Sequence, residues 1–191
     1  MDQILFINAC PRPDSRTREL AQHVLSKLEG KVEKLRLFDE QIPPLDLKGM
    51  EERDRAVRSG DLDAPILRYA RQFARADVIV VAAPYWDLLF PTVVRAYFEA
   101  TTVTGVTFRY TPEGFPAGLC RAKKLIYITT AGGPIGEYNL GFDYVKALAS
   151  LYYGIPEVKC YTAEFLDIVG ADVPAIMAKA KEAIDKDFEK E

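Results

Sequence analysis

The sequence is poor in the residue types from which metal centres and many catalytic sites are built. Its 191 residues include one histidine and three cysteines. Cys10, Cys120 and Cys160 are odd in number and far apart, which matches neither a disulfide framework nor a CxxC metal or iron–sulfur motif. No HExxH pattern occurs, and His23 falls on a predicted helix, where we expect a surface residue rather than a catalytic base. The sequence predicts three reduced thiols and no metal site.

The chain also lacks a strong charge imbalance and a long apolar run. Its 25 Lys and Arg against 28 Asp and Glu leave a formal net charge of -3, which gives no general attraction to nucleic acid or to an anionic membrane. The longest apolar run, residues 78–83, is far shorter than the ~20 residues that cross a bilayer. No basic segment with a cleavage site precedes the apolar residues that begin at Ile4. We expect a cytoplasmic protein that binds neither nucleic acid nor a membrane.

Two absent motifs narrow the functional classes further. The sequence contains neither GxxxxGK[ST] nor GxGxxG, which disfavours an ATPase and a dinucleotide-binding fold of the GxGxxG type. It also has no internal repeat and no low-complexity linker. A chain of this length can bury roughly 70% of its extended surface in one core. The expected organisation is a single domain, residues 1–191.

What the sequence does contain is a regular alternation of strand-like and helix-like segments. Short apolar runs predict buried strands at residues 4–7, 78–82, 125–130 and 158–163, and a mixed segment at 32–37 is typical of an edge strand. Apolar spacing and proline starts predict helices at residues 16–28, 65–73, 91–101, 142–152 and 172–188, with a surface helix at 51–58. Residues 102–121 form an excursion rich in Thr, Gly, Pro and aromatics. The pattern predicts an α/β fold: a flavodoxin-like, doubly wound, five-stranded parallel sheet in the order 2-1-3-4-5, with helices on both faces.

In such a sheet the loops after strands one, three and four meet in one ligand crevice. The first of them, residues 8–18, contains Cys10, Ser15 and Thr17 together with three arginines, Arg12, Arg16 and Arg18, at the start of a helix. Free N–H groups and the partial positive charge of a helix start suit a phosphate. The alternative, an ordinary Ser or Thr cap with the arginines in solvent, stays open. The helix dipole could also lower the pKa of Cys10, although we favour a packed, unreactive thiol.

The other two loops offer surfaces for a planar ring. The loop after the third strand contains two aromatics and an acid, in the sequence Pro84, Tyr85, Trp86, Asp87 and Leu88. A loop at a strand end must surface, although aromatic residues more often belong to the core. After the fourth strand, Gly132 and Gly133 would let backbone amides approach a ring edge, a property that a plain turn shares. Because the three loops meet at one edge of the sheet, a ligand site is favoured over an ordinary helix cap, core aromatics and a plain turn.

Three stretches of the chain carry a resemblance to a known family. They are residues 78–84 with the helix that starts at Pro91, the run Gly105-Val106-Thr107-Phe108-Arg109-Tyr110-Thr111, and the segment from Gly118 through Lys123 to Gly133. In these stretches, and more loosely over nearly the whole chain, the sequence resembles the FMN-dependent NADH azoreductases and NAD(P)H quinone reductases. The GVTFRYT run is the most specific part of the likeness.

The resemblance implies a homodimer that holds one non-covalent FMN per subunit and uses NADH or NADPH as co-substrate. The residues that match the family's cofactor site are Cys10, Ser15, Arg16 and Thr17 for the phosphate, and Pro84, Tyr85, Trp86, Asp87, Leu88, Thr130, Ala131, Gly132 and Gly133 for the ring. Aromatics at the positions of Tyr110 and Tyr152 border the family's substrate site, from different subunits. The flavin performs the chemistry, so no catalytic side chain and no metal are implied.

The sequence departs from the family at the ring loops. The family commonly has Met-Tyr-Asn-Phe where this chain has Tyr85-Trp86-Asp87-Leu88, and Ser-Arg-Gly-Gly where it has Thr130-Ala131-Gly132-Gly133. A carboxylate of Asp87 that faced the ring would disfavour an anionic reduced flavin and lower its reduction potential. The altered loop also leaves open which acceptor is reduced.

The predicted function is an FMN-dependent oxidoreductase that works by ping-pong hydride transfer. NAD(P)H passes a hydride to flavin N5, the oxidised nucleotide leaves, and a small flat aromatic acceptor, a quinone or an azo compound, takes the electrons. One alternative is a flavodoxin-like electron carrier, which would need a protein partner. The mild net charge of -3 and the excursion at 102–121 disfavour it. A second alternative is a flavin-free relative that has lost the site, for which the changed Tyr85 loop is the motive.

Overall fold

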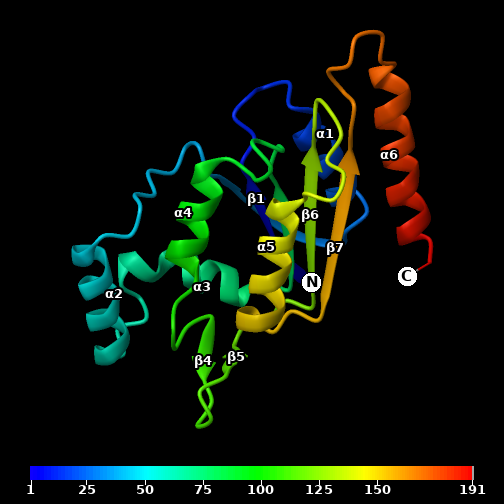
Figure 1. Ribbon diagram of the computed structural model, residues 1–191. Helices are drawn as coiled ribbons and strands as arrows, with labels where there is room; N and C mark the ends of the chain where they lie inside the picture. Colours follow the sequence, from blue (N-terminus) through cyan, green and yellow to red (C-terminus); the bar gives the residue numbers. More distant parts are fainter. Residues whose placement is uncertain (191) are drawn as a thin grey trace.

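A five-stranded parallel sheet forms the centre of the computed structural model, which describes residues 1–190 (Figure 1). Its strands are β1 (Asp2–Asn8), β2 (Gly30–Arg36), β3 (Val78–Ala82), β6 (Lys124–Thr130) and β7 (Glu157–Ala163). They lie in the order β2-β1-β3-β6-β7, and every neighbouring pair is parallel. Because β4 and β5 belong to a separate hairpin, this is the predicted order 2-1-3-4-5, and the flavodoxin-like fold is confirmed.

Apolar side chains alternate between the two faces of the central strands. In β6, Leu125 and Tyr127 belong to one buried cluster, whereas Ile126 and Ile128 belong to the other. All four side chains are fully buried, as expected for a parallel strand that is covered on both faces. β2 lies at the edge of the sheet, and Leu35 is its only buried residue, so the predicted edge strand is also confirmed.

Helices cover both faces of the sheet, as predicted. α1 (Arg16–Leu25) and α6 (Val173–Phe188) pack on one face, and α3 (Arg68–Arg75), α4 (Thr92–Thr101) and α5 (Leu140–Leu148) pack on the other (Figure 1). The side chain of Asp172 caps α6 by accepting a hydrogen bond from the N–H of Ala175 at 3.0 Å. None of the helices in residues 1–190 is both long and apolar enough to span a bilayer.

The helix ends differ from the prediction where a side chain caps the backbone. α1 stops at Leu25 instead of residue 28, because the hydroxyl of Ser26 donates to the carbonyl of His23 at 2.7 Å and ends the helix. α2 (Leu47–Ser59) is longer than the predicted 51–58, because the carboxylate of Asp46 accepts the N–H of Gly49 at 2.7 Å and starts it earlier. Alternation and apolar spacing cannot detect such caps.

Two predicted helices are divided in the structure. The segment predicted at 65–73 begins with a single 3-10 turn, η1 (Pro65–Leu67), before α3. The helix predicted at 142–152 is α-helical only to Leu148 and continues as a π-helical turn, η2 (Ala149–Tyr153), which Gly154 closes in the left-handed conformation (φ 70°). The apolar spacing that predicted this helix consists of Phe142, Val145, Ala149 and Tyr152. Val145 and Ala149 are fully buried, and Phe142 and Tyr152 are half-buried.

The excursion at residues 102–121 contains a short hairpin that the sequence analysis did not predict. It pairs β4 (Phe108–Tyr110) with β5 (Pro116–Gly118) in antiparallel register, and strands of three residues are too short to show a periodicity. A Cβ on Gly118 would lie 2.2 Å from the carbonyl carbon of Tyr153, so only glycine lets the hairpin base touch η2. The hairpin hangs at the amino end of β6, opposite the carboxyl ends of the strands (Figure 1).

Candidate functional site

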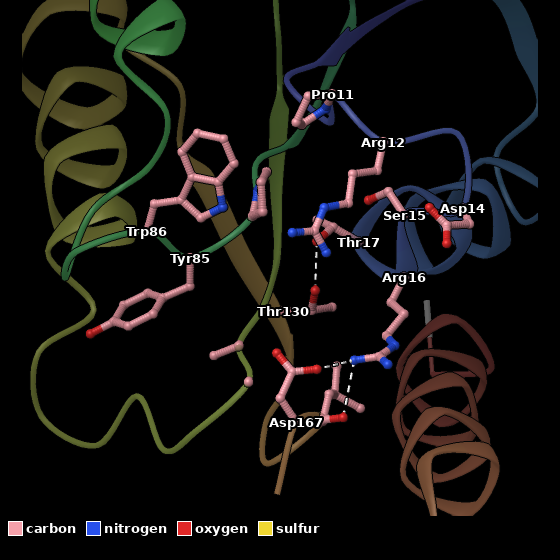
Figure 2. Close-up of a pocket in the computed structure, with 14 residues that line it drawn as sticks. Pro11, Arg12, Asp14, Ser15, Arg16, Thr17, Tyr85, Trp86, Thr130 and Asp167 are labelled. Atoms are coloured by element: carbon pink, nitrogen blue, oxygen red, sulfur yellow. Dashed lines mark hydrogen bonds and ion pairs between the residues drawn. The ribbon is translucent and has the colours of Figure 1, made fainter.

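A cavity of about 260 Å³ opens where β1, β3, β6 and β7 end. The loop that follows each of these strands contributes to its wall, as Figure 2 shows. The lining residues are Pro11, Arg12, Asp14, Ser15, Arg16, Thr17, Pro84, Tyr85, Trp86, Thr130, Ala131, Gly132, Leu166 and Asp167. The cavity therefore lies at the edge of the sheet where the sequence predicted a ligand crevice.

The start of α1 forms one wall of the cavity. Ser15 caps the helix, and its Oγ accepts a hydrogen bond from the N–H of Arg18 at 3.3 Å. Two residues further on, Oγ1 of Thr17 lies 2.6 Å from Oγ1 of Thr130, and both residues are buried. One of these two hydroxyls donates to the other, which leaves a single hydroxyl proton for a further acceptor. The first N–H groups of a helix have no partner within it, so this wall is rich in donors.

Two arginines of this loop line the cavity, and they differ in whether their guanidinium groups have partners in the protein. Arg16 forms an ion pair with Asp167, its Nη1 lying 2.8 Å from Oδ1, and the same nitrogen donates to the carbonyl of Leu166 at 3.0 Å. These contacts tie the start of α1 to the loop after β7. Arg12 is exposed and has no hydrogen-bond or ion-pair partner among residues 1–190.

The loop after β3 makes a tight turn that fixes the position of Trp86. Trp86 and Leu89 exchange two backbone hydrogen bonds, of 3.2 Å and 2.8 Å. Between them, Asp87 and Leu88 have positive φ angles of 49° and 70°, the arrangement of a type I′ turn that normally contains Asn or Gly. A leucine in this conformation stores strain of about 1–2 kcal/mol.

Tyr85 joins the loops after β3 and β6. Its N–H donates to the carbonyl of Thr130 at 3.1 Å, and its hydroxyl donates to the carbonyl of Tyr138 at 3.0 Å. The neighbouring Trp86 is 44% exposed at the cavity wall. An indole that is held in place but not covered offers a flat surface to a planar ligand.

Gly132 permits a close approach of the loops after β6 and β7. A Cβ at this position would lie 2.3 Å from Oδ2 of Asp167. The N–H of Asp167 donates to the carbonyl of Gly132 at 2.9 Å, and the N–H of Leu166 donates to that of Ala131 at 3.2 Å. The neighbouring Gly133 has open space around it, so only the first of the two glycines is sterically required.

The predicted cofactor residues fall into two groups in the structure. Those that line the cavity are Ser15, Arg16, Thr17, Pro84, Tyr85, Trp86, Thr130, Ala131 and Gly132. Asp87 and Leu88 lie at the tip of the turn, and they do not belong to the lining; nor do Gly133 and Cys10.

Cys10 is buried, and its Sγ lies 3.7 Å from the carbonyl oxygen of Ala82. Burial raises the pKa of the Cys10 thiol, and this outweighs the lowering by the Ser15 hydroxyl and by the charge of Arg18. The helix dipole therefore does not produce a reactive thiolate, and the packed thiol that the sequence favoured is what the structure contains.

The two predicted substrate residues lie together, but far from the cavity of their own chain. The rings of Tyr110 and Tyr152 both pack edge-on against Phe108, with centroids 5.4 Å and 4.8 Å away. Phe108 belongs to the hairpin at the opposite end of the sheet (Figure 1). Tyr110 is 53% exposed there.

The sequence analysis missed the contribution of the fourth loop. Leu166 and Asp167 line the cavity after β7, and they carry no motif. The strand order alone could have placed them at the cavity, because the last parallel strand also ends at this edge of the sheet. In the first loop, Pro11 and Asp14 line the cavity as well, although neither was predicted to do so. Arg12, one of the three arginines that the sequence offered for a phosphate, also lines it.

Comparison with known proteins gives the chain close relatives. A family model described as a flavodoxin-like fold matches residues 2–188. An FMN-dependent NADH:quinone oxidoreductase of Lachnoclostridium phytofermentans is 37% identical over 194 residues, which cover 95% of this chain and 96% of the relative. The crystal structure of an azoreductase from Bacillus anthracis str. Sterne has a TM-score of 0.85 at 25% identity, and 100% of each chain is covered. An FMN-dependent NADH-azoreductase from Bacillus anthracis str. Ames Ancestor, solved in complex with FMN, has the same fold, with a TM-score of 0.79 at 19% identity over 100% of this chain and 99% of that chain.

Proposed function

The chain belongs to the family that shares the flavodoxin-like fold, and from this membership we propose that it is an FMN-dependent NAD(P)H oxidoreductase that reduces quinones. The observation that carries the proposal is the cavity at the carboxyl ends of β1, β3, β6 and β7, where a helix start and an exposed indole line one space. Sheets of this kind bind their ligands at this edge.

The donors at one end of the cavity fit the phosphate of FMN. The start of α1 supplies unpaired N–H groups and a partial positive charge. The hydroxyl pair of Thr17 and Thr130 supplies one further donor, and Ser15 and Arg12 lie beside it. A dianionic group with several acceptor oxygens matches this set of donors.

The other end of the cavity fits a flat ring. Pro84, Tyr85 and Trp86 come from one side, and Ala131 and Gly132 come from the other. Gly132 presents backbone without a side chain, which lets a ring edge approach closely. Bound FMN would supply hydride and electron transfer between NAD(P)H and an acceptor, while these residues hold and orient it and exclude water from its covered face.

One chain leaves this site incomplete, and we propose that a second copy completes it. A cavity of about 260 Å³ lies below the roughly 300–1,000 Å³ that enclose a drug-sized ligand. Tyr110 and Tyr152 lie at the other end of the sheet with free aromatic surface. The resemblance implied that the two aromatics of one site come from different subunits. Because both rings pack on Phe108 of one chain, we propose instead that they border the partner's site together, which would account for the exposure of Tyr110.

The acceptor is proposed to be a small flat aromatic compound, with quinones as the principal class and azo compounds as a second. The quinone assignment is supported by the name of the 37% identical relative, and the azo assignment by the azoreductase of 25% identity. The name of the 37% identical relative also specifies NADH. We therefore propose NADH as the co-substrate, and its rate should be compared with that of NADPH.

We propose that the protein is a single domain and works in the cytoplasm. Cys10, Cys120 and Cys160 are all free, which is consistent with a reducing compartment. The matched segment of the family model, residues 2–188, runs without interruption through every element described above.

Reduction of bound flavin by nucleotide tests the proposed function directly. The purified chain should show the visible absorption of oxidised flavin, NADH should bleach it anaerobically, and a quinone should restore it without any other protein. A flavin that stays oxidised until a partner reductase is added would instead identify an electron carrier. A colourless chain that does not take up added FMN would identify a relative that has lost the site.

The substrate role of Tyr110 is tested by a pair of variants. Tyr110→Ala should lower kcat/KM for quinones about three- to tenfold, because an aromatic contact is worth roughly 0.5–1.5 kcal/mol, while bound FMN stays unchanged. Tyr110→Phe keeps the ring and should retain most of the turnover. Equal turnover of every quinone by the alanine variant would contradict the role in the acceptor site.

A further inference from the structure

The two arginines that line the cavity differ in whether their charge is already neutralised. We propose that Arg12 binds the anionic end of the ligand and so selects FMN over uncharged riboflavin, whereas Arg16 is a structural clamp. The sequence offered Arg12, Arg16 and Arg18 as guanidiniums near a phosphate, and the family resemblance selected Arg16 among them. This inference rests on the proposed function, because it concerns the same cavity.

The contacts of Arg16 commit its guanidinium to the protein. Its Nη1 lies 2.8 Å from a carboxylate oxygen of Asp167 and 3.0 Å from the carbonyl oxygen of Leu166. The carboxylate compensates the positive charge, and the two bonds hold the loop after β7 against the start of α1. These two contacts use Nη1, and the carboxylate of Asp167 already compensates the charge of the guanidinium, so a phosphate gains less attraction from Arg16 than from an arginine without a carboxylate partner.

Arg12 has no such commitment. It lines the cavity and is exposed, and within residues 1–190 its guanidinium has neither a carboxylate nor a carbonyl as a partner. Figure 2 draws its side chain reaching from the loop toward the cavity, while Asp14 lies on the other side of Ser15. A planar guanidinium can donate two parallel hydrogen bonds to a phosphate, so no rearrangement of existing contacts is needed.

The charges around the cavity support the same division. The lining contains two arginines and two aspartates, Asp14 and Asp167, which together carry no net charge. Once Arg16 and Asp167 neutralise each other, Arg12 is the cavity's cation that is available to an anion. A ligand without a phosphate gains nothing from it, and the selectivity for FMN over riboflavin follows.

Flavin affinity measured with and without the phosphate tests this assignment. FMN and riboflavin are titrated into the full chain freed of flavin, with fluorescence quenching as the readout. Arg12→Ala should weaken FMN about tenfold, the lower end of the range for a hydrogen bond to a charged group at an exposed site, and should leave riboflavin within about twofold. Arg12→Lys, which keeps the charge but loses the fork, should fall between Arg12→Ala and the unaltered chain.

Two further variants control for charge and for folding. Arg18→Ala also removes one positive charge, from α1 rather than from the loop before it, and Arg18 does not line the cavity, so this variant should change FMN affinity less than about twofold. Arg16→Ala should lower the thermal unfolding midpoint and weaken FMN and riboflavin by similar factors, because it loosens a wall of the cavity. Arg12 has no hydrogen bond or ion pair to any of residues 1–190, so Arg12→Ala should keep the midpoint of the unaltered chain.

The salt dependence gives an independent readout. Between ionic strengths of ~0.01 M and ~0.15 M the Debye length falls from about 30 Å to about 8 Å, and FMN affinity should fall more in the unaltered chain than in Arg12→Ala. Three results would each overturn the inference. The first is an FMN affinity that Arg12→Ala leaves unchanged, and the second is an equal loss of FMN and riboflavin affinity in Arg12→Ala. The third is a loss of affinity in Arg16→Ala that is specific to FMN. Failure of the unaltered chain to bind either flavin would overturn the proposed function itself, and this inference with it.

Discussion

Replacing Gly132 by alanine perturbs the closest approach between two loops of the cavity. A Cβ at this position would lie 2.3 Å from Oδ2 of Asp167 and 3.0 Å from its Cβ and Cγ. The carboxylate can swing aside because the side chain is 72% exposed, but the Cβ of Asp167 is fixed to its backbone. The loop itself must therefore move, against the 2.9 Å hydrogen bond from the N–H of Asp167 to the carbonyl of Gly132.

Three contributions set the loss of stability in Gly132→Ala. Losing the exposed ion pair of Asp167 with Arg16 costs about 0.2–1 kcal/mol, and overpacking with a backbone shift costs about 1–3 kcal/mol. Restricting the unfolded chain returns about 0.4–1 kcal/mol. The net destabilisation is about 2 kcal/mol, which lowers the unfolding midpoint of a chain of this size by about 4–8 °C.

Gly133→Ala is the matched control, because it makes the same chemical change one residue away. A Cβ on Gly133 meets nothing within 4 Å, so this variant should unfold at the same temperature or slightly higher. Thermal unfolding by circular dichroism, followed by titration with FMN, compares the two. Only Gly132→Ala should also bind FMN more weakly, since Gly132 lines the cavity and Gly133 does not. Equal midpoints and equal FMN affinities for the two variants would refute the steric argument.

The turn after β3 and the three thiols give two further predictions. Leu88→Gly should raise the free energy of unfolding by about 0.5–1 kcal/mol, because it relieves a left-handed leucine at φ 70° but makes the unfolded chain more flexible. Asp87→Gly should gain less, since aspartate tolerates this conformation. An unfolding midpoint that Leu88→Gly leaves unchanged would contradict the strain. Burial raises the pKa of Cys10, and raises those of Cys120 and Cys160 to about 12, so the neutral thiols contribute stability that is present below their ordinary pKa of 9.0 and is lost as the pH rises above it. Near neutral pH the thiolate fraction of Cys120 and Cys160 should be about a thousandfold lower than in a free thiol. A disulfide reagent should therefore modify them much more slowly in the folded chain than in denaturant. Equal rates in the two conditions would show that burial does not protect them.

Much of the fold could be predicted because its signals are local and repeated. Each buried strand is a short apolar run, and the helix faces follow from spacings such as Val94, Tyr97 and Phe98, all of which are fully buried. The errors concentrate where one hydrogen bond decides the outcome. The hydroxyl of Ser26 ends α1 early, and the carboxylate of Asp46 starts α2 early, and neither contact has a periodic signature.

The candidate site was predictable to the level of the strand ends but not of the side-chain contacts. Topology brings the loops after β1, β3 and β6 together, and residues of all three line the cavity. The pairing of Arg16 with Asp167 joins residues 151 positions apart, and no motif announces it. Whether Asp87 faces the cavity depends on two positive φ angles, which a sequence of Asp and Leu does not suggest.

The contact at Gly118 determines which parts of the molecule are free to move. With the backbone of Tyr153 so near Gly118 that no Cβ fits between them, the hairpin is joined to the end of η2 and can move only with the helical layer behind it. We therefore expect the hairpin to move with this layer rather than as a flap with its own hinge, and its Phe108 to keep its contacts with Tyr110 and Tyr152. Amide hydrogen exchange at the hairpin base should then follow the slow opening of the core rather than the fast exchange of a loop. If the hairpin does not open by itself, the loops at the other end of the sheet are the segments that must move to admit a ligand to the cavity.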